Sequence, residues 1–238
     1  MSRIIFQKEY MILFPSFVRA QVHKHPFMHL FVGSKTCQIV VNDEKVQGNR
    51  ILLDSNVKHM VEPDHHCDFF LLIDHTSHVA RQLRDNYLQP APYCHMEGQI
   101  VEMPENMAGL PEEEVIAGVE KLLASMGVTE QPSEGRDERV RQVIEKLTSG
   151  EWLGYSVKEL AQVVYLSESR LTHLFKEEEG ISLKSYILTR RLERAYRYVN
   201  AGGKITQAAQ EAGFSGSAHL AYSCKKFTGV SISDVTNL

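Results

Sequence analysis

One local pattern occurs twice between Ser156 and Gly229 and decides the fold of the second half of the chain. The first copy is Ser156-Val-Lys-Glu-Leu-Ala-Gln-Val-Val-Tyr-Leu-Ser-Glu-Ser-Arg-Leu-Thr-His-Leu-Phe-Lys176, and the second is Lys204-Ile-Thr-Gln-Ala-Ala-Gln-Glu-Ala-Gly-Phe-Ser-Gly-Ser-Ala-His-Leu-Ala-Tyr-Ser-Cys-Lys-Lys-Phe227. Each copy predicts a short helix, a tight turn and a second helix, because a capping residue precedes each apolar run.

Helix caps and a glycine mark the ends of these elements. Ser156 begins a capping box, and Ser167 can cap the following helix. In the second copy Thr206 and Ser215 occupy the expected cap positions, and Gly213 suits the positive φ of a tight turn. Short capped helices joined in this way are typical of a helix-turn-helix unit, whose second helix enters the major groove of DNA. A helical bundle without DNA is the alternative, and the doubled pattern favours nucleic acid.

The second helix of each copy has polar side chains opposite its apolar ones, and these are the candidate DNA contacts. Arg170 lies near the N-terminal end of its helix, where base edges are contacted, and a guanidinium can bridge guanine O6 and N7. Lys176 lies further along and is the expected phosphate contact. The full set is Ser169, Arg170, Thr172, His173 and Lys176 in the first unit, and Ser215, Ser217, Ala218, His219, Tyr222 and Lys225 in the second.

The charge is divided unevenly between the two halves of the chain. The overall formal charge is −4, but residues 136–238 hold 15 Lys and Arg against 12 Asp and Glu, whereas residues 1–135 hold 11 against 18. This asymmetry indicates a basic DNA-binding module with an acidic companion. Because the basic excess is small, attraction to phosphates must come from local placement of Arg and Lys, including the arginines of the 183–199 helix.

Length and composition indicate two globular domains. The chain has 238 residues, of which 43% are hydrophobic and 24% charged. No apolar run approaches the roughly 20 residues that span a bilayer, and no signal peptide opens the sequence. The four cysteines lack paired spacing, which suits a reducing compartment. We therefore expect a cytoplasmic protein with no membrane partner.

Residues 1–79 are expected to form β structure, because short apolar runs alternate with turn residues such as Asn42-Asp43. Many short strands of this kind predict a small barrel or sandwich. Helices are predicted over 78–87, 111–126, 137–148 and 183–199. The apolar stripe of the 111–126 helix suits either the core or the seam of a dimer.

The expected fold class is therefore α+β. Residues 1–128 form the predicted effector-binding or dimerisation domain, 129–136 have linker composition, and 137–238 form an all-α domain. In that domain a long helix joins the two helix-turn-helix units and is long enough to hold them roughly one DNA turn apart.

Nine of the eleven histidines fall within residues 23–95. His23, His25 and His29 have the spacing His-x-His-x3-His, and His59 follows Gly48 by eleven residues. Imidazoles that converge from such spacings can bind Zn²⁺, Ni²⁺, Cu²⁺ or Fe²⁺. Two alternatives stay open: the histidines line a pocket for an organic effector, or they are hydrogen-bonded residues with no ligand.

The chain resembles transcription regulators of the arabinose-regulator (AraC/XylS) family, most strongly over residues 137–235. The matching motifs are Ser167-x3-Leu171-x2-Leu174-Phe175-Lys176, Gly180-Ile-Ser-Leu-Lys-Ser-Tyr186, Arg190-Arg-Leu-Glu-Arg-Ala195, Ala209-x3-Gly213-Phe214-Ser215 and Lys226-Phe-Thr-Gly229. The resemblance implies two units that contact adjacent major grooves of double-stranded DNA. It also implies an N-terminal cupin-like barrel that binds a small-molecule or metal effector or forms a homodimer, contact with RNA polymerase as in an activator, and no enzymatic activity.

The histidine spacing is similar to the two metal-binding motifs of cupin barrels. His29 stands at the glutamate position of the first motif, and Asp54 and Asn56 replace the proline and glycine of the second. In the second helix-turn-helix unit, Ala208, Leu220 and Cys224 replace larger residues, Ile232 replaces a proline, and Tyr222 stands where an arginine is common. These departures predict a thinner second core and make the first unit the main base-contacting one.

Two functions from other classes are the alternatives. One is a metal-dependent cupin enzyme with a helical appendage, which would turn over a small substrate. The other is an adaptor whose helical domain binds a protein partner, which would have no affinity for duplex DNA.

Overall fold

The structure is a computed structural model that describes residues 3–14, 21–62, 67–96, 103–104, 106–129, 135–229 and 231–232. The architecture is α+β, as the sequence predicts. Contacts divide the chain into two compact units, one made of Met1–Pro132 with Lys226–Leu238 and the other of Ser133–Lys225. Among the described residues, no helix combines the length and apolar character that crossing a membrane requires.

A seven-stranded antiparallel sheet dominates the first unit. Its strands are β1 (Arg3–Phe6), β2 (Tyr10–Phe14), β3 (Phe27–Val41), β4 (Glu44–Leu53), β5 (His59–Val61), β6 (Phe69–Asp74) and β7 (Tyr93–His95). The order is β1-β2-β6-β3-β4-β7, and β5 pairs with β3 off this path. The predicted hairpin turn joins β3 to β4: Asn42 and Asp43 have φ of 49° and 70°, which short polar side chains tolerate.

β3 pairs with two different strands along one of its edges. Its first part, Phe27–Val32, pairs with β6, and its last part, Ile39–Val41, pairs with β5, while β4 follows the other edge. The register against β4 shifts between Val32 and Cys37. Such an irregularity bends a strand and increases its twist, so the sheet curls at this point.

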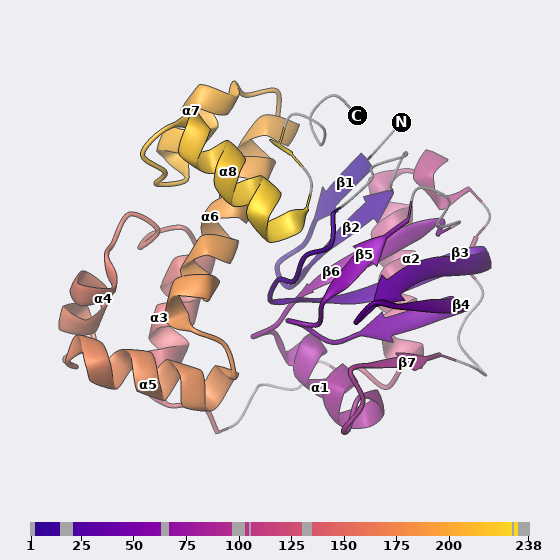
Figure 1. The fold of residues 1–238 in the computed structure, drawn as a ribbon, viewed down its shortest axis with the longest axis horizontal. Coiled ribbons are helices and arrows are strands. Elements are labelled where there is room, and N and C mark those ends of the chain that lie inside the picture. The colour runs from indigo at the N-terminus through magenta and orange to yellow at the C-terminus, as the bar shows by residue number, and fades with distance from the viewer. Residues whose placement is uncertain are drawn as a thin grey trace. The chain divides into compact units, whose positions relative to one another are not determined.

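The sheet curls without closing within the described residues, which corrects the predicted barrel. β1 pairs only with β2 in this part of the chain, and β7 only with β4. Two helices, α1 (His78–Tyr87) and α2 (Glu112–Ser125), lie against the sheet (Figure 1). Val115, Val119 and Leu122 of α2 join one apolar cluster with residues of the strands. This packing buries the face that a closed barrel would enclose, and it places the α2 stripe in the core rather than in a dimer seam.

The helical half contains α3 (Glu138–Thr148), α4 (Val157–Val163), α5 (Glu168–Glu179), α6 (Leu183–Asn200), α7 (Ile205–Glu211) and α8 (Ser217–Thr228). Figure 1 shows α6 as the connection between the α4–α5 pair and the α7–α8 pair. The first pair has a continuous core that includes Leu147 of α3, Leu160 of α4, Phe175 of α5 and Tyr186 of α6. The two predicted helix-turn-helix units are therefore present and share α6.

The two turns have the same hydrogen bonds. In each, one amide donates to the carbonyl three residues earlier, at 3.1 or 3.0 Å, and the next donates to the carbonyl five residues earlier, at 2.8 Å. The donors are the amides of Tyr165 and Leu166 in the first turn and of Gly213 and Phe214 in the second. Tyr165 and Gly213, at equivalent positions, have φ of 56° and 75°. The repeat seen in the sequence is thus a repeat of backbone conformation.

The predicted caps are correct in the first copy and wrong in the second. Ser156 forms the capping box with Glu159, and the Ser167 hydroxyl accepts from the Arg170 amide. In the second copy the extended cap residue is Lys204, one position before the α7 start, so Thr206 lies inside the helix. Helix α8 begins at Ser217, so Ser215 lies too early to be its cap residue. The Ser215 hydroxyl instead hydrogen-bonds to Nδ1 of His219 at 3.0 Å.

The left-handed conformation of Tyr165 predicts a stabilising substitution. Its side chain is 95% exposed, so Tyr165→Gly removes little packing and relieves a backbone conformation that costs about 1–3 kcal/mol in non-glycine residues. Glycine is more flexible in the unfolded chain, so we expect a net gain of about 1 kcal/mol in the free energy of unfolding, measured with denaturant. Gly213→Ala at the equivalent position is the matched opposite. It introduces a Cβ 3.2 Å from the Leu153 carbonyl and should destabilise; a loss of stability with Tyr165→Gly would contradict the strain argument.

Candidate nucleic-acid interface and ligand sites

Helix α5 presents the first set of candidate DNA contacts. Ser169, Arg170, His173 and Lys176 are exposed, and Thr172 is half-buried. They lie opposite the buried Leu171, Leu174 and Phe175, as helical spacing predicts. The Arg170 guanidinium lies 3.9 Å from the Glu177 carboxylate, and both side chains are more than half exposed. Such an exposed ion pair contributes little energy, so Arg170 can exchange this partner for a base or a phosphate.

The second set lies on α8 and in the turn before it. Ser215, Ala218, His219, Tyr222 and Lys225 are exposed, and Ser217 is half-buried. The His219 ring contacts Phe214 edge-on at 5.3 Å between centroids. Together with the Ser215 hydroxyl bond, this contact holds the imidazole at the start of α8. Tyr222 is 65% exposed on the outer face of α8.

The buried side of the second unit has the small residues noted in the sequence. Ala208, Ala209 and Ala212 are fully buried, as are Leu220 and Cys224. The Tyr196 hydroxyl of α6 lies 2.6 Å from the Cys224 sulfur. A tyrosine from α6 therefore occupies part of the space that larger residues of α8 would fill.

The structure contradicts the predicted phosphate-contacting face of α6 for two of its four arginines, Arg190 and Arg191. Arg194 is exposed, and its guanidinium lies 4.0 Å from the Glu211 carboxylate. Arg190 is buried and its guanidinium lies 2.9 Å from the Glu193 carboxylate. Arg191 donates to the Leu153 carbonyl at 2.9 Å, and Arg197 pairs with Glu193 at 2.8 Å. Helical spacing alone could not show that the Glu193 carboxylate pairs with Arg190 and Arg197. Nor could it show that the Leu153 carbonyl accepts a hydrogen bond from Arg191. Arg190 and Arg191 therefore hold the helical domain together.

Replacement of Arg190 should affect stability rather than DNA affinity. Arg190→Ala leaves Glu193 with one partner instead of two, and breaking a buried ion pair typically costs about 3–5 kcal/mol. Because Arg197 still pairs with Glu193, we expect a loss of about 2–3 kcal/mol in the free energy of unfolding. The dependence of DNA affinity on salt should be unchanged in the folded variant. A shallower salt dependence, measured by fluorescence anisotropy, would instead make Arg190 a phosphate contact.

The four predicted metal ligands lie together in the first unit. His23 and His59 form an isolated antiparallel bridge. His29 lies on β3, and His25 lies on the segment between His23 and His29. One ring nitrogen of each of His23, His25 and His59 lies within 4.8 Å of the others. The centroid of the His29 ring is 4.8 Å from that of His25 and 4.6 Å from that of His59.

The two substitutions in the second cupin-like motif have clear structural roles. Asn56 has φ of 59° at the position of a motif glycine, and asparagine tolerates this conformation better than most residues. Asp54, at the proline position, pairs with Arg84 of α1 at 2.9 Å. This arginine holds the pKa of the Asp54 carboxyl below its usual value despite the opposing effect of burial.

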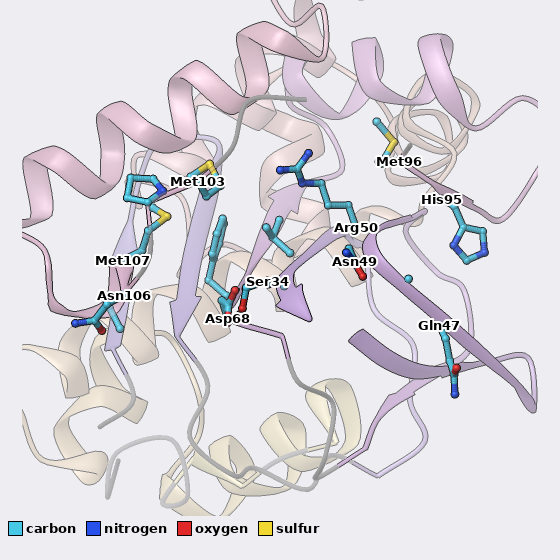
Figure 2. A pocket seen from close by; sticks show the side chains of 16 residues that line it. Ser34, Gln47, Asn49, Arg50, Asp68, His95, Met96, Met103, Asn106 and Met107 are labelled. Carbon is cyan, nitrogen blue, oxygen red and sulfur yellow. Dashed lines mark hydrogen bonds between the residues drawn. The ribbon is translucent and has the colours of Figure 1, made fainter. Parts of the chain in front are cut away.

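A large pocket lies elsewhere in the same unit and was not found from the sequence. Its volume is about 1190 Å³. Figure 2 shows Arg50 of β4 between Met103 and Met107 on one side and His95 of β7 on the other. Other polar residues in the lining are Ser34, Gln47, Asn49, Asp68 and Asn106. They come from β3, β4, the start of β6 and the segment before α2, so no short sequence spacing connects them.

The polar end of the pocket is built around Asp68. Its carboxylate accepts hydrogen bonds from the Ser34 amide and hydroxyl, at 2.5 and 3.2 Å. Gly48 lies beside His95, and a Cβ added there would come within 2.8 Å of its ring. The pocket therefore combines a cation, a fixed carboxylate and thioether side chains, which adapt to irregular apolar ligands.

Comparisons with known proteins agree with this architecture. Residues 160–237 match a family model described as a helix-turn-helix domain. The chain is 34% identical over 77 residues to the probable transcriptional regulator LumQ of Photobacterium leiognathi, a match that covers 32% of this chain and 31% of LumQ. The chain thus spans about a third of this curated relative.

Two solved structures of ToxT from Vibrio cholerae are similar over almost the whole chain. One, from strain O395, is bound to (E)-4-(8-methylnaphthalen-1-yl)but-3-enoic acid; it has 12% identity and a TM-score of 0.57, with 100% of this chain and 98% of that chain covered. The other, from strain SCE256, is bound to an unsaturated fatty acid; it has 14% identity and a TM-score of 0.53, with 97% and 95% covered.

These matches define the class of the helical half first: residues 160–237 form a helix-turn-helix domain, as the sequence motifs imply. The chain as a whole has the α+β fold of ToxT, with an N-terminal sheet and a C-terminal helical domain. The helix-turn-helix domain and the two-part fold that the family resemblance implied are therefore confirmed.

Proposed function

We propose that the protein is a sequence-specific DNA-binding transcription regulator of the AraC type. The observation that carries this proposal is the pair of turns with equivalent hydrogen bonds, each followed by a helix with an exposed polar face. A turn of this kind fixes the second helix relative to the first, as insertion into a major groove requires. In α5, Arg170 and His173 lie one turn apart near the capped end, where base edges are within reach.

The contribution of the two units to affinity should differ. α5 has an arginine and a lysine on its exposed face, whereas α8 has Tyr222 where an arginine is common. Loss of that cation removes a phosphate or guanine donor. The first unit is thus the main source of sequence discrimination, and the second binds chiefly to the backbone.

The first unit is the proposed effector domain. Two ToxT structures contain carboxylic acids with apolar bodies, and the pocket around Arg50 has matching chemistry: a guanidinium for a carboxylate and Met96, Met103 and Met107 for an apolar body. An amphipathic carboxylic acid is therefore the proposed effector class. The Asp68 carboxylate would repel an acid that entered with its charge toward β3, so the orientation with the charge at Arg50 is favoured.

We also propose that the protein acts in the cytoplasm and catalyses no reaction. It would contact RNA polymerase and bind DNA as a pair of copies. The alternatives make different predictions: a metal-dependent enzyme turns over a small substrate, and a protein-binding adaptor has no affinity for duplex DNA. Selection of bound fragments from genomic DNA by the full chain distinguishes the regulator from both alternatives, and turnover of a small substrate distinguishes the enzyme from the adaptor.

Substitutions in α5 test the roles of its cations. Arg170→Ala should lower affinity for the selected operator by about 1–3 kcal/mol more than for scrambled DNA, because a lost guanine contact affects discrimination. Lys176→Ala should weaken both complexes about equally and reduce the slope of log K against log salt by about one unit. His219→Ala in α8 should cost less than Arg170→Ala. The measurement is competition binding on operator and scrambled duplexes at several salt concentrations.

The two α5 variants are matched controls for each other, since both remove one exposed cation from the same helix. If Arg170→Ala weakens operator and scrambled DNA alike, Arg170 contacts phosphate and the base contact lies elsewhere. If neither the full chain nor its variants bind any duplex, the proposed function itself is wrong.

The pocket has its own test. Arg50→Gln keeps a polar side chain of similar length but removes the charge, so a long-chain unsaturated fatty acid should bind at least about tenfold more weakly, since a hydrogen bond to a charged group is worth about 1.5–3 kcal/mol. The measurement is isothermal titration of the full chain. Asn49→Ala, in the same lining, controls for nonspecific damage, and the methyl ester of the acid should bind wild type and Arg50→Gln equally. Equal binding of the free acid by both proteins would remove Arg50 from the effector site.

A further inference from the structure

In two of the four clustered histidines, a hydrogen bond determines which ring nitrogen can bind a metal. The ring of His23 places Nδ1 2.7 Å from the Gln21 carbonyl, and the ring of His59 places Nδ1 2.9 Å from the Val57 carbonyl. A carbonyl only accepts hydrogen bonds, so in both rings Nδ1 carries the proton and Nε2 has a free lone pair. A carbonyl bonded to the second ring nitrogen is also the usual way in which proteins orient a metal-binding histidine.

Two buried nitrogens of the cluster have no protein partner. Nε2 of His59 and Nδ1 of His29 make no hydrogen bond to any described residue, although His59 is 2% and His29 3% exposed. Burial of an unsatisfied polar atom costs about 1–3 kcal/mol. Two such atoms within a cluster of imidazoles are an arrangement that stability alone does not favour, and a bound ligand would satisfy both.

Burial disfavours the charged form of all four rings. Burial and the neighbouring His59 and His23 rings lower the pKa of His25, and burial and the other three rings lower the pKa of His29. Burial, followed by the charge of His23, lowers the pKa of His59 to about 4. Burial also lowers the pKa of His23, against the effect of its bond to Gln21.

We propose that His23, His25 and His59, with His29 beside them, bind one divalent transition-metal ion of the Zn²⁺, Cu²⁺ or Ni²⁺ class within the N-terminal unit. Neutral imidazole is a borderline ligand that suits these ions, whereas Mg²⁺ and Ca²⁺ require oxygen ligands. Two imidazoles on a tetrahedral ion have ring centroids about 5 Å apart, given metal–nitrogen distances of 2.0–2.1 Å. The centroid separations here run from 4.3 Å for His23 and His59 to 5.2 Å for His23 and His25.

His25 enters the site differently from the others. Its Nδ1 accepts a hydrogen bond from the Phe27 amide at 3.2 Å, so the ring gives up this long bond or moves its proton when it coordinates. His23 and His59 are therefore the anchoring ligands, and His25 and His29 complete the shell. The site is separate from the Arg50 pocket, whose lining includes none of the four histidines. This inference is independent of the proposed DNA-binding function.

The test is stoichiometric binding of Co²⁺ and Zn²⁺ to the full chain after treatment with a chelator. We expect one equivalent of Co²⁺, with the visible absorption of a nitrogen-coordinated ion, displaced by one equivalent of Zn²⁺. The midpoint of thermal unfolding should rise with added Zn²⁺, because the ion binds the folded state. His59→Gln and His23→Ala should each weaken binding at least about 100-fold, since even loss of an outer-shell partner costs 10–100-fold.

His78→Gln is the matched control, because His78 lies outside the cluster and pairs with Glu9; it should bind one equivalent like the wild type. His23 is only half-buried, so His23→Ala decides the matter if His59→Gln fails to fold. No stoichiometric Co²⁺ or Zn²⁺ binding by the wild type overturns the proposal, and so does unchanged affinity in folded His23→Ala. DNA binding by the same preparations is measured separately, so loss of the metal site is not confused with loss of the proposed regulator function.

Discussion

The curl of β3 determines where the ligand-binding residues of the first unit lie. A straight strand has one neighbour on each edge, but β3 exchanges β6 for β5 along the same edge at the irregularity after Val32. His29 lies before this point, and His59 is opposite Val41, near the end of the strand. Their rings are nevertheless 4.6 Å apart. Hydrogen bonding along a bent strand thus brings together residues that an extended strand would hold far apart.

The two faces of β3 contribute to two different apolar clusters, because successive side chains of a strand point to opposite faces, and the pocket lies at the bend. Met28, Leu30 and Val32 face the cluster that α1 and α2 cover, whereas Phe31, Ile39 and Val41 belong to another cluster. Gly33 and Ser34, at the bend itself, line the pocket. A polar opening at this position is expected, because a strand that breaks its pairing leaves backbone groups that need polar partners. Asp68 supplies one such partner to Ser34.

Local signals in the sequence identified most of the helical half. Ser156 and Ser167 are caps in the structure as predicted, because a cap depends on a few neighbouring residues. Lys204 could not be predicted as a cap, since its side chain makes no capping bond and only the backbone marks the helix start. The burial of Arg190 depends on contacts within the folded domain, and helical periodicity carries no information about them.

Less of the N-terminal half could be predicted from the sequence, because its pocket and the closure of its sheet depend on contacts between residues distant in the chain. The histidine spacing led to the cluster because three of its members lie within seven residues of each other. The pocket lining is assembled from strands and a loop distant in sequence, so no spacing could indicate it. Closure of the sheet could not be predicted either, since α2 buries the same apolar face that a barrel interior would bury.

The length of helix α6 determines both the distance and the rotation between the two helix-turn-helix units. Its 18 residues include no glycine or proline, and its ends belong to the two helix-turn-helix units. Each residue in a helix advances the chain by about 1.5 Å and turns it by about 100°. Insertion of a single residue would therefore rotate α7 and α8 by more than a quarter turn about the α6 axis relative to α4 and α5. Side chains on the surface of α6 are free to vary, whereas its length is constrained by the helical repeat of whatever duplex the two units share.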